Sequence, residues 1–314
     1  MQQREFLLAV TLAIGAATFV WGQTQAPPIG PANSGKERAA SNPDFSGIWT
    51  HPFWPGFDPP LSGPGPVVNK SRMPNGVGNS DQLVGDYTNP ILKPQAAEII
   101  KKHGEISLKG VTYPTPANQC WPQPVPYILW TIGIQMLQQP DKITILYSNP
   151  DHESRRVRMN QAHPALVTPS WYGDSVGHYE GDTLVIDTVG IKNARPFAMA
   201  DVYGTPYTEA LHVVERYRLV DDAAAKESEA RTLKENIPIP FNDSGLFVDP
   251  NNRDKALQLQ FTVEDEGVFT MPWSASMIYR RASGAWPEFV CSENTHEYYA
   301  GKESEVPRAD RPDF

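Results

Sequence analysis

Short apolar runs recur along the chain from about residue 44 onward, and clusters of Pro, Gly, Asn and Asp separate them. The runs are rich in β-branched and aromatic residues, which favours strands over helices. Residues 139–142 (QPDK) and 180–182 (EGD) are short enough to join neighbouring strands as tight turns, which makes those strands antiparallel. The expected strands are residues 44–50, 134–138, 141–147, 154–159, 175–179, 183–188, 210–219, 257–263 and 274–279.

About eight strands in this order close most economically as an antiparallel up-and-down β-barrel, because closure leaves no exposed sheet edge. We therefore expect a mainly β protein with long Pro/Gly-rich loops and one or two short helices. Residues 94–103 (PQAAEIIKKH) predict a helix, since a proline starts the segment, Glu98 precedes Lys102 by four residues and Gly104 can cap the end.

The expected strand at residues 154–159 carries arginines on both of its faces. Arg156 and Arg158 share one face, opposite Arg155 and Val157, because successive side chains of a strand alternate. If the Arg156 face points inward, a cavity in the barrel has a basic polar floor. If it points outward, these arginines form a solvated edge, and the pattern leaves both arrangements open.

The first residues have the pattern of a cleavable secretory signal, residues 1–22. Arg4 precedes a mostly apolar stretch from Phe6 to about Val20, and the small Gly22 follows. The stretch of about 15 residues is shorter than the roughly 20 that a spanning helix needs, which argues against the alternative of a membrane anchor. We therefore expect cleavage near Gly22, a periplasmic or secreted mature protein and no stable membrane insertion.

Three further segments interrupt the pattern of strands. Residues 23–43 lack an apolar period and predict a flexible lead-in, so a single barrel domain is expected to span residues 44–314. The Pro/Gly-rich tract at residues 51–89 is either an ordered binding loop or a disordered one. Residues 222–254 form an insertion with an Ala-rich start, and this insertion is a candidate flap over the barrel mouth.

Composition limits the partners and the compartment. The net charge is −9, from 27 basic and 36 acidic residues, and no Lys/Arg-rich run is present, so nucleic acid is not an expected partner. Cys120 and Cys291 are an even pair in a chain expected to be exported, which predicts one long-range disulfide; two separate buried thiols are the alternative. The pattern does not reveal an oligomeric state.

Residues 171–190 (WYGDSVGHYEGDTLVIDTVG) resemble a large group of exported bacterial proteins of unassigned function that share a W-x-G-x-S-x-G-x-W-E-G-D-T-L-V-V-x-T-x-G core. Residues 46–49 (SGIW) are similar to the start of lipocalin-type barrels. The resemblance implies a lipocalin-like (calycin-type) barrel and no settled activity. The chain departs from the group at Tyr179, where Trp is usual, and at Tyr207, where His is frequent. Other matching pieces are residues 120–122, 156–164, 209–211, 215–216, 264–265, 272–273 and 291–294.

Several common kinds of site find little support. The seven histidines show no His-x-His or His-Glu-x-x-His spacing, so no metal is expected, although a three-dimensional site from His152, His163 and His178 stays open. No glycine-rich phosphate loop follows a strand, and we expect no nucleotide or other cofactor. Residues 173–177 match the G-x-S-x-G of nucleophile elbows, but a strand and hairpin follow rather than a helix, so Ser175 is expected to be a sheet residue.

What remains is a set of groups suited to acid/base chemistry. A His or Tyr beside a carboxylate in a dry cavity can remove a proton, and an Arg can hold the developing anion. For each such residue the alternative is a structural role in a surface ion pair, and for each aromatic residue a place in the core. The candidate catalytic residues are Arg156, His163, His178, Tyr207 and Glu209, with Glu215 as a further carboxylate. The candidate ligand-binding residues are Arg158, Trp171, Tyr179 and Trp273.

This set favours a cofactor-free lyase or isomerase that acts on a small apolar or aromatic molecule enclosed by the barrel. Two alternatives use the same fold. One is a non-catalytic carrier or scavenger of a hydrophobic small molecule, and the other is an envelope structural or interaction module that needs no cavity.

Overall fold

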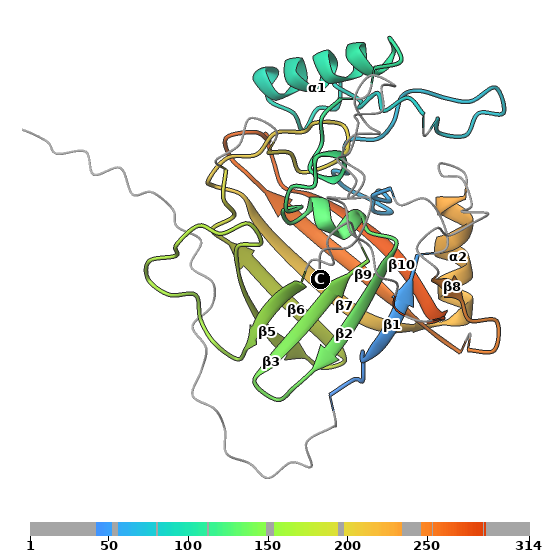
Figure 1. Cartoon of the computed structure of the whole chain (residues 1–314), viewed down its shortest axis with the longest axis vertical. Coiled ribbons are helices and arrows are strands. Elements are labelled where there is room, and N and C mark those ends of the chain that lie inside the picture. Colours follow the sequence, from blue (N-terminus) through green and yellow to red (C-terminus); the bar gives the residue numbers. More distant parts are fainter. Residues whose placement is uncertain are drawn as a thin grey trace, which may run out of the picture. The chain divides into compact units, whose positions relative to one another are not determined.

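Strands dominate the regular structure of the chain (Figure 1). The computed structural model describes residues 42–51, 56–79, 81–111, 113–148, 154–193, 198–233, 246–252, 254–284 and 286. The strands are β1 (Gly47–Thr50), β2 (Gly133–Gln138), β3 (Lys142–Tyr147), β4 (Ser154–Met159), β5 (Asp174–Glu180), β6 (Thr183–Val189), β7 (His212–Asp221), β8 (Phe247–Val248), β9 (Lys255–Glu264) and β10 (Trp273–Ser283).

The sheet closes into a barrel. The strands follow the order β1-β2-β3-β4-β5-β6-β7-β9-β10, and β10 returns to pair with β1, so that Trp49 lies opposite Arg281. The Arg281 guanidinium stacks 3.8 Å from the centre of the Trp49 ring, and this contact stabilises the pairing of β1 with β10. The short β8 pairs with the end of β10 outside the ring. The predicted mainly β barrel is confirmed, with nine strands in the ring rather than eight.

One pair of strands departs from the antiparallel expectation. β4 and β5 are parallel, with Val157 opposite Ser175 and Met159 opposite Gly177. A parallel pair needs a connection that returns to the starting end of the sheet, and residues 160–173 supply it. Side chains pack tightly at this pair, since a Cβ on Gly177 would lie 2.9 Å from Cγ1 of Val157. The prediction that every neighbouring pair is antiparallel was therefore wrong here.

Alternation along each strand fills the barrel with one set of side chains. The inward residues are large and buried, among them Trp49, Phe261 and Trp273. Burying each such side chain contributes roughly 1.5–3 kcal/mol, so the core accounts for much of the stability. On β4 the inward residues are Arg155, Val157 and Met159, whereas Arg156 is exposed and Arg158 half-buried on the outer face. The outward arrangement of Arg156 and Arg158 is the one that occurs.

A buried ion pair crosses the barrel interior. The Arg155 Nη2 atom lies 2.8 Å from Oε2 of Glu215, and both side chains are at most 1% exposed. The Tyr217 hydroxyl donates a second hydrogen bond to the same carboxylate oxygen at 2.8 Å. Burial acts to lower the pKa of the Arg155 guanidinium, but the nearby Glu215 outweighs it and raises this pKa, so Arg155 keeps its charge inside the barrel.

Helix α1 (Pro94–Ser107) starts at the predicted proline but runs one turn beyond His103. Gly104 does not cap it. Instead Gly104 is buried in the helix, where an added Cβ would lie 3.0 Å from Cγ1 of Val84. Two short 3₁₀ helices, η1 (Ala117–Gln119) and η2 (Tyr127–Trp130), follow before β2.

Helix α2 (Asp222–Thr232) forms the first part of the insertion expected at residues 222–254. Asp221 caps it, since its carboxylate accepts a hydrogen bond from the Ala224 amide at 2.8 Å. Arg280 of β10 holds the helix against the barrel through Glu229 and Asp222, at 2.6 and 2.7 Å. The helix is docked on the outer face of β7, β9 and β10 and does not form a flap at this part of the insertion.

The tract at residues 51–89 has local order over its described residues. Short bridges join Asn69 to Gly85 and Arg72 to Gly78, and Asp58 pairs with Ser276 of β10. This favours the ordered loop of the two alternatives. No helix among the described residues is long and apolar enough to cross a membrane. Residues 1–41 and Cys291 lie outside the described residues, so the export signal, the lead-in and the disulfide with Cys120 stay predictions.

Candidate acid/base site

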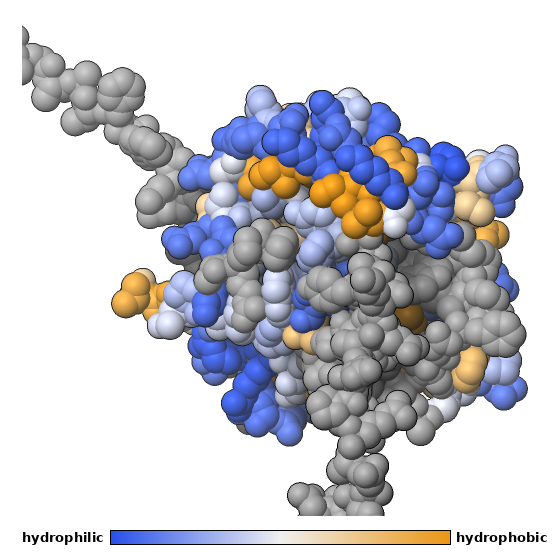
Figure 2. Space-filling view, turned by 45° about the horizontal axis from the view of Figure 1, so that its top comes forward, coloured by the Kyte–Doolittle hydropathy of each residue, from blue (hydrophilic) through white to orange (hydrophobic). Residues whose placement is uncertain are grey.

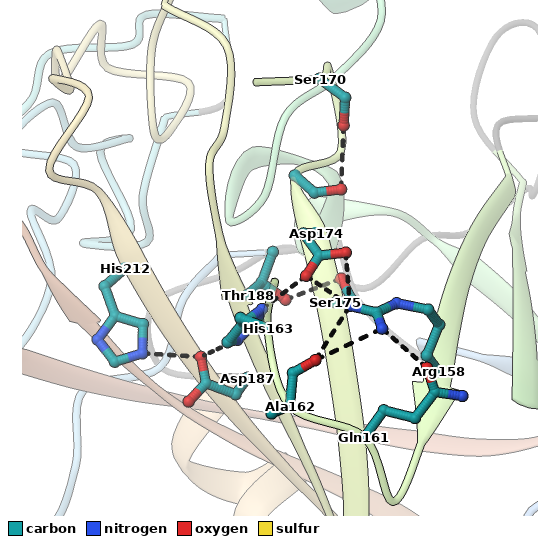
Figure 3. Close-up of polar contacts among 11 residues, drawn as sticks. Arg158, Gln161, Ala162, His163, Ser170, Asp174, Ser175, Asp187, Thr188 and His212 are labelled. Carbon is teal, nitrogen blue, oxygen red and sulfur yellow. Dashed lines mark hydrogen bonds and ion pairs between the residues drawn. The ribbon is translucent and has the colours of Figure 1, made fainter. Parts of the chain in front are cut away.

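A chain of charged side chains lies on the outer face of the barrel where β5, β6, β7 and β9 meet (Figure 3). We call it the histidine–carboxylate network. Side chains alternate along these strands, so the outward residues of one strand lie beside the outward residues of the next. The network consists of Arg158, His163, Asp174, Asp187, His212 and Glu264.

Asp187 is the centre of the network. It stands on β6 between the inward-facing Ile186 and Thr188 and therefore points outward. Its Oδ1 atom lies 2.9 Å from Nε2 of His212 and 3.2 Å from Nε2 of His163. One carboxylate oxygen thus joins two imidazole rings (Figure 3).

His163 comes from the connection between β4 and β5 and bridges two carboxylates. Its Nδ1 atom lies 2.7 Å from Oδ2 of Asp174, the first residue of β5, and its Nε2 faces Asp187. Both ring nitrogens are therefore within hydrogen-bond distance of a carboxylate. These two contacts hold the His163 ring as a fixed part of the network.

Arg158 fixes the far end of the network. Its Nη2 atom contacts both oxygens of Asp174, at 2.9 and 2.7 Å, and its Nη1 donates to Oε1 of Gln161 at 2.8 Å. The Asp174 carboxylate is therefore held by both an arginine and a histidine. Arg158 thus fixes the Asp174 carboxylate, and this carboxylate orients the His163 ring through its Nδ1 atom.

His212 has a different environment on each side of its ring. Its Nε2 is bonded to Asp187, whereas its Nδ1 faces Oε2 of Glu264 at 3.6 Å, beyond hydrogen-bond distance. The hydrogen bond to Asp187 raises the pKa of His212, with burial opposing and the charges of Asp187 and Glu264 adding to it. Burial acts to raise the pKa of Asp187, but hydrogen bonds and charges from His212 and His163 outweigh it, so that this pKa is lowered.

A surface pocket of about 430 Å³ opens beside His212 and Glu264. Its other walls include the apolar side chains of Phe269, Met271 and Pro272. Asp265 also lies along it, but its carboxylate is occupied by hydrogen bonds from Thr208 and Gly267. A small molecule in this pocket would meet an apolar wall on one side and two acid/base groups on the other.

The structure brings only part of the predicted catalytic set together. His163 belongs to the network, as does Arg158 from the ligand-binding set. Arg156 is exposed on the outer face of β4, and Glu209 is exposed in the turn before β7. Their positions give neither residue a place in the network.

His178 and Tyr207 also lie elsewhere. His178 is on β5 four residues beyond Asp174, exposed, with its Nε2 3.1 Å from Oε1 of Glu180. Tyr207 is buried, and its hydroxyl donates to the Lys192 carbonyl at 3.0 Å. Burial raises the pKa of Tyr207, which makes its hydroxyl a structural donor rather than a base.

The three aromatic candidates for ligand binding have other partners. Trp273 is 2% exposed and stacks edge-on with Phe261 and Phe269 in the core. The Tyr179 hydroxyl accepts a hydrogen bond from Nε2 of Gln138 at 2.7 Å. Trp171 lies under the Lys192 ammonium at 4.9 Å from the ring centre. The core alternative therefore holds for Trp273, whereas Tyr179 and Trp171 are only partly buried.

Four network residues were not singled out from the sequence: Asp174, Asp187, His212 and Glu264. Asp187 is the one charged residue of β6, whose other residues are Thr, Leu, Val and Ile, and this is a signal in itself. His212 and Glu264 begin and end strands and lie directly opposite each other across the β7–β9 pair. Only the strand pairing identifies them as neighbours, so their spacing in the chain carries no such signal.

Two other predicted chemistries can be compared with the structure. Ser175 is buried inside the sheet, and its Oγ lies 2.9 Å from Oγ1 of Thr188, so it is the predicted sheet residue and not an exposed nucleophile. Within the described ranges, no group of three or more His, Cys, Asp or Glu side chains is arranged to hold a metal ion. His152, one member of the three-histidine alternative, lies outside those ranges.

Comparisons with known proteins do not bear on this site. No family model, no curated protein and no solved structure matches the chain. The candidate site therefore rests on the residues of this chain and their geometry.

Proposed function

We propose that this protein is an exported, cofactor-free acid/base enzyme, a lyase or an isomerase, that acts on a small apolar or aromatic molecule bound beside His212. The observation that carries the proposal is the position of His212 between Asp187 and the pocket. Asp187 orients the ring through Nε2, which leaves the Nδ1 side to exchange a proton with a bound molecule.

Glu264 supplies the second group that such a reaction needs. Its carboxylate lies on the same pocket, and its side chain is 53% exposed, so a ligand can reach it. A carboxylate next to an imidazolium is a base beside an acid. Glu264 would remove a proton from a carbon activated by a carbonyl group. His212 would donate a proton to the carbonyl oxygen, so that the electron pair released from the C–H bond is stabilised as a neutral enol.

The two classes of reaction differ in the fate of the enol. In the isomerisation of a β,γ-unsaturated carbonyl compound, the enol is a dienol. Glu264 returns its proton to the γ carbon, the double bond moves between the α and β carbons, and the O–H proton returns to His212 as the carbonyl forms again. In an elimination, the carbonyl forms again as a leaving group departs from the β carbon; that group takes the proton held by Glu264, and the O–H proton returns to His212. Neither sequence changes the oxidation state of the substrate overall, so neither needs a redox partner.

The pocket is on the outside of the barrel, whereas the sequence led us to expect a ligand inside. Two observations support the outer position. The inward-facing residues described include bulky buried groups such as Tyr147, Tyr217 and Tyr279, and the acid/base groups His212 and Glu264 face outward. The charge of the network also suits a surface site, because Asp187 and Glu264 stay partly hydrated.

Mass spectrometry of molecules altered by the protein tests this proposal. The purified wild type and the His212→Gln variant are incubated with extracts of spent growth medium, and the compounds consumed and formed are compared. His178→Gln is the matched control, because His178 is also a half-exposed histidine beside a carboxylate. We expect a substrate and product pair of equal mass, or of masses that differ by a small leaving group, with wild type and His178→Gln only.

Other outcomes would support the alternatives. A compound that is retained by the wild type and by His212→Gln, and recovered unchanged, would indicate a carrier. An extract left unchanged, with no compound retained, would contradict both and favour the structural module.

A further inference from the structure

A second pocket lies apart from the network, between α1 and the segment that leads to η2. It has a volume of about 300 Å³ and shares no lining residue with the acid/base pocket. His103 and Ser107 of α1 form one wall, and Tyr113 and Asn118 form the other. Exposed apolar residues are grouped nearby: Figure 2 shows hydrophobic residues among the hydrophilic ones where α1 lies, and Ile99, Leu108 and Val111 are 45–55% exposed.

His103 is a deeply buried polar group in the wall of this pocket. It is 2% exposed, and neither of its ring nitrogens has a hydrogen-bond partner among the described residues. Burial lowers the pKa of His103 to about 4; the Leu83 backbone opposes this shift but does not reach hydrogen-bond geometry with the ring. The ring is therefore neutral near pH 7, with one N–H donor and one nitrogen acceptor.

The neighbours of His103 fix its ring in place. The Tyr113 ring lies 4.1 Å away, centre to centre, at an angle of 44°. Gly204 approaches the imidazole so closely that an added Cβ would lie 2.6 Å from Cδ2 of His103. A buried polar group held in this way, without a partner, normally indicates a ligand or a specific function, since leaving it unsatisfied costs about 1–3 kcal/mol.

The walls of the pocket indicate the kind of molecule that fits. Aromatic and apolar side chains line it, among them Tyr127, Trp130 and Val202. No Lys or Arg is among its described lining residues, which disfavours an anion, and the only acid, Asp81, is exposed and so hydrated. The volume is at the lower end for ligand pockets and suits one or two aromatic rings.

We propose that this pocket binds a small neutral aromatic molecule whose hydroxyl group hydrogen-bonds to His103. The phenolic O–H would donate to the unprotonated ring nitrogen, and the ring would lie against Tyr127 and Trp130. This gives the protein a binding site for phenol-like molecules in addition to the acid/base pocket, and it does not depend on the proposed enzyme activity.

Binding of 2-naphthol, followed by its fluorescence, tests the proposal, with naphthalene as the probe that lacks the hydroxyl. We expect saturable 1:1 binding of 2-naphthol to the full chain, about tenfold tighter than binding of naphthalene, which is the contribution of one hydrogen bond. In His103→Phe the two probes should bind equally. His178→Phe, a substitution at an exposed histidine, should leave the tenfold preference intact.

Two further variants keep the test decisive if His103→Phe fails to fold. Val111 is 55% exposed at the rim, so Val111→Trp should block the pocket without disturbing the core and weaken both probes at least tenfold. Met271→Trp, which fills the acid/base pocket instead, should leave binding unchanged. No saturable binding of 2-naphthol, wild-type affinity in Val111→Trp, or loss of binding in Met271→Trp alone would each overturn the proposal.

Discussion

The Nε2 atom of His212 lies 2.9 Å from Oδ1 of Asp187, and this contact orients the imidazole at the edge of the pocket. The contact stabilises the imidazolium form, so the pKa of His212 lies above its ordinary value of 6.5. In Asp187→Asn the acceptor loses its charge. We expect the pKa of His212 to fall towards its ordinary value, measured by NMR titration of its ring protons.

The same shift has a consequence for stability. A histidine with a raised pKa in the folded state stabilises the fold at pH values below 6.5, and this stabilisation is lost as pH rises through the folded pKa. The unfolding free energy of His212→Gln should therefore lie below that of wild type at pH 6, and the difference should be smaller at pH 9, measured by urea unfolding. A difference that grows with pH would contradict the assignment.

Asp174 is expected to be a positioning residue. It touches Arg158 and His163, and only through them the rest of the network. Asp174→Asn should lower the unfolding free energy by about 1 kcal/mol, since the side chains are only partly buried. It should also lower kcat about tenfold while KM stays near wild type, because His163 then no longer holds Asp187, the carboxylate that orients His212. An unchanged kcat with the expected loss of stability would show that Asp174 is structural only.

The buried pair of Arg155 and Glu215 should behave differently from the surface network. Removing one member leaves its partner buried without a counter-charge, so Glu215→Leu or Arg155→Met should each cost about 3–5 kcal/mol. The double substitution Arg155→Met with Glu215→Leu should recover most of that loss, measured by urea unfolding in a double-mutant cycle. Additive losses would mean that the two residues do not depend on each other.

Asp201 gives a second pH test, of the same sign as that of His212 but at lower pH. Burial raises its pKa to about 6, although the amides of Tyr203 and Thr205 donate hydrogen bonds to its carboxylate. A carboxyl with a raised pKa in the folded state stabilises the fold below its unfolded value of 3.8, and the stabilisation is lost as pH rises towards 6. Relative to Asp201→Asn, wild type should lose about 3 kcal/mol of stability over this range. Parallel pH profiles of the two proteins would contradict the raised pKa.

The barrel was predictable from the sequence because the features that specify it, alternation within a strand and tight turns between strands, each involve only a few consecutive residues. Alternation in residues 183–188 fixes which side chains share a face, and the turn at residues 180–182 fixes the pairing of β5 with β6. The parallel β4–β5 pair was not predictable. The sequence of residues 160–173 does not show that this connection crosses back to the end of the sheet where β4 begins. Helix α2 was missed although Asp221 supplies a cap and an Ala-rich run follows it.

The candidate site was predictable only in part. His163 and Arg158 were identified by residue type, but their partners lie on other strands. The faces of β4 illustrate the reason: alternation separates Arg155 from Arg156, and the partner that Arg155 meets inside the barrel, Glu215, lies far away in the chain on β7. Long-range pairing is set by the whole core, so it cannot be deduced from the spacing of a few polar residues.

Exchange of substrate protons with solvent is the most direct test of the central claim, that His212 and Glu264 move protons on a bound molecule. The substrate found by mass spectrometry is incubated in D2O with wild type, His212→Gln, Glu264→Gln and the control His178→Gln. We expect deuterium at the activated carbon with wild type and with the control, and incorporation at least about 100-fold slower in the two site variants. Equal rates of incorporation in wild type and His212→Gln would contradict the account.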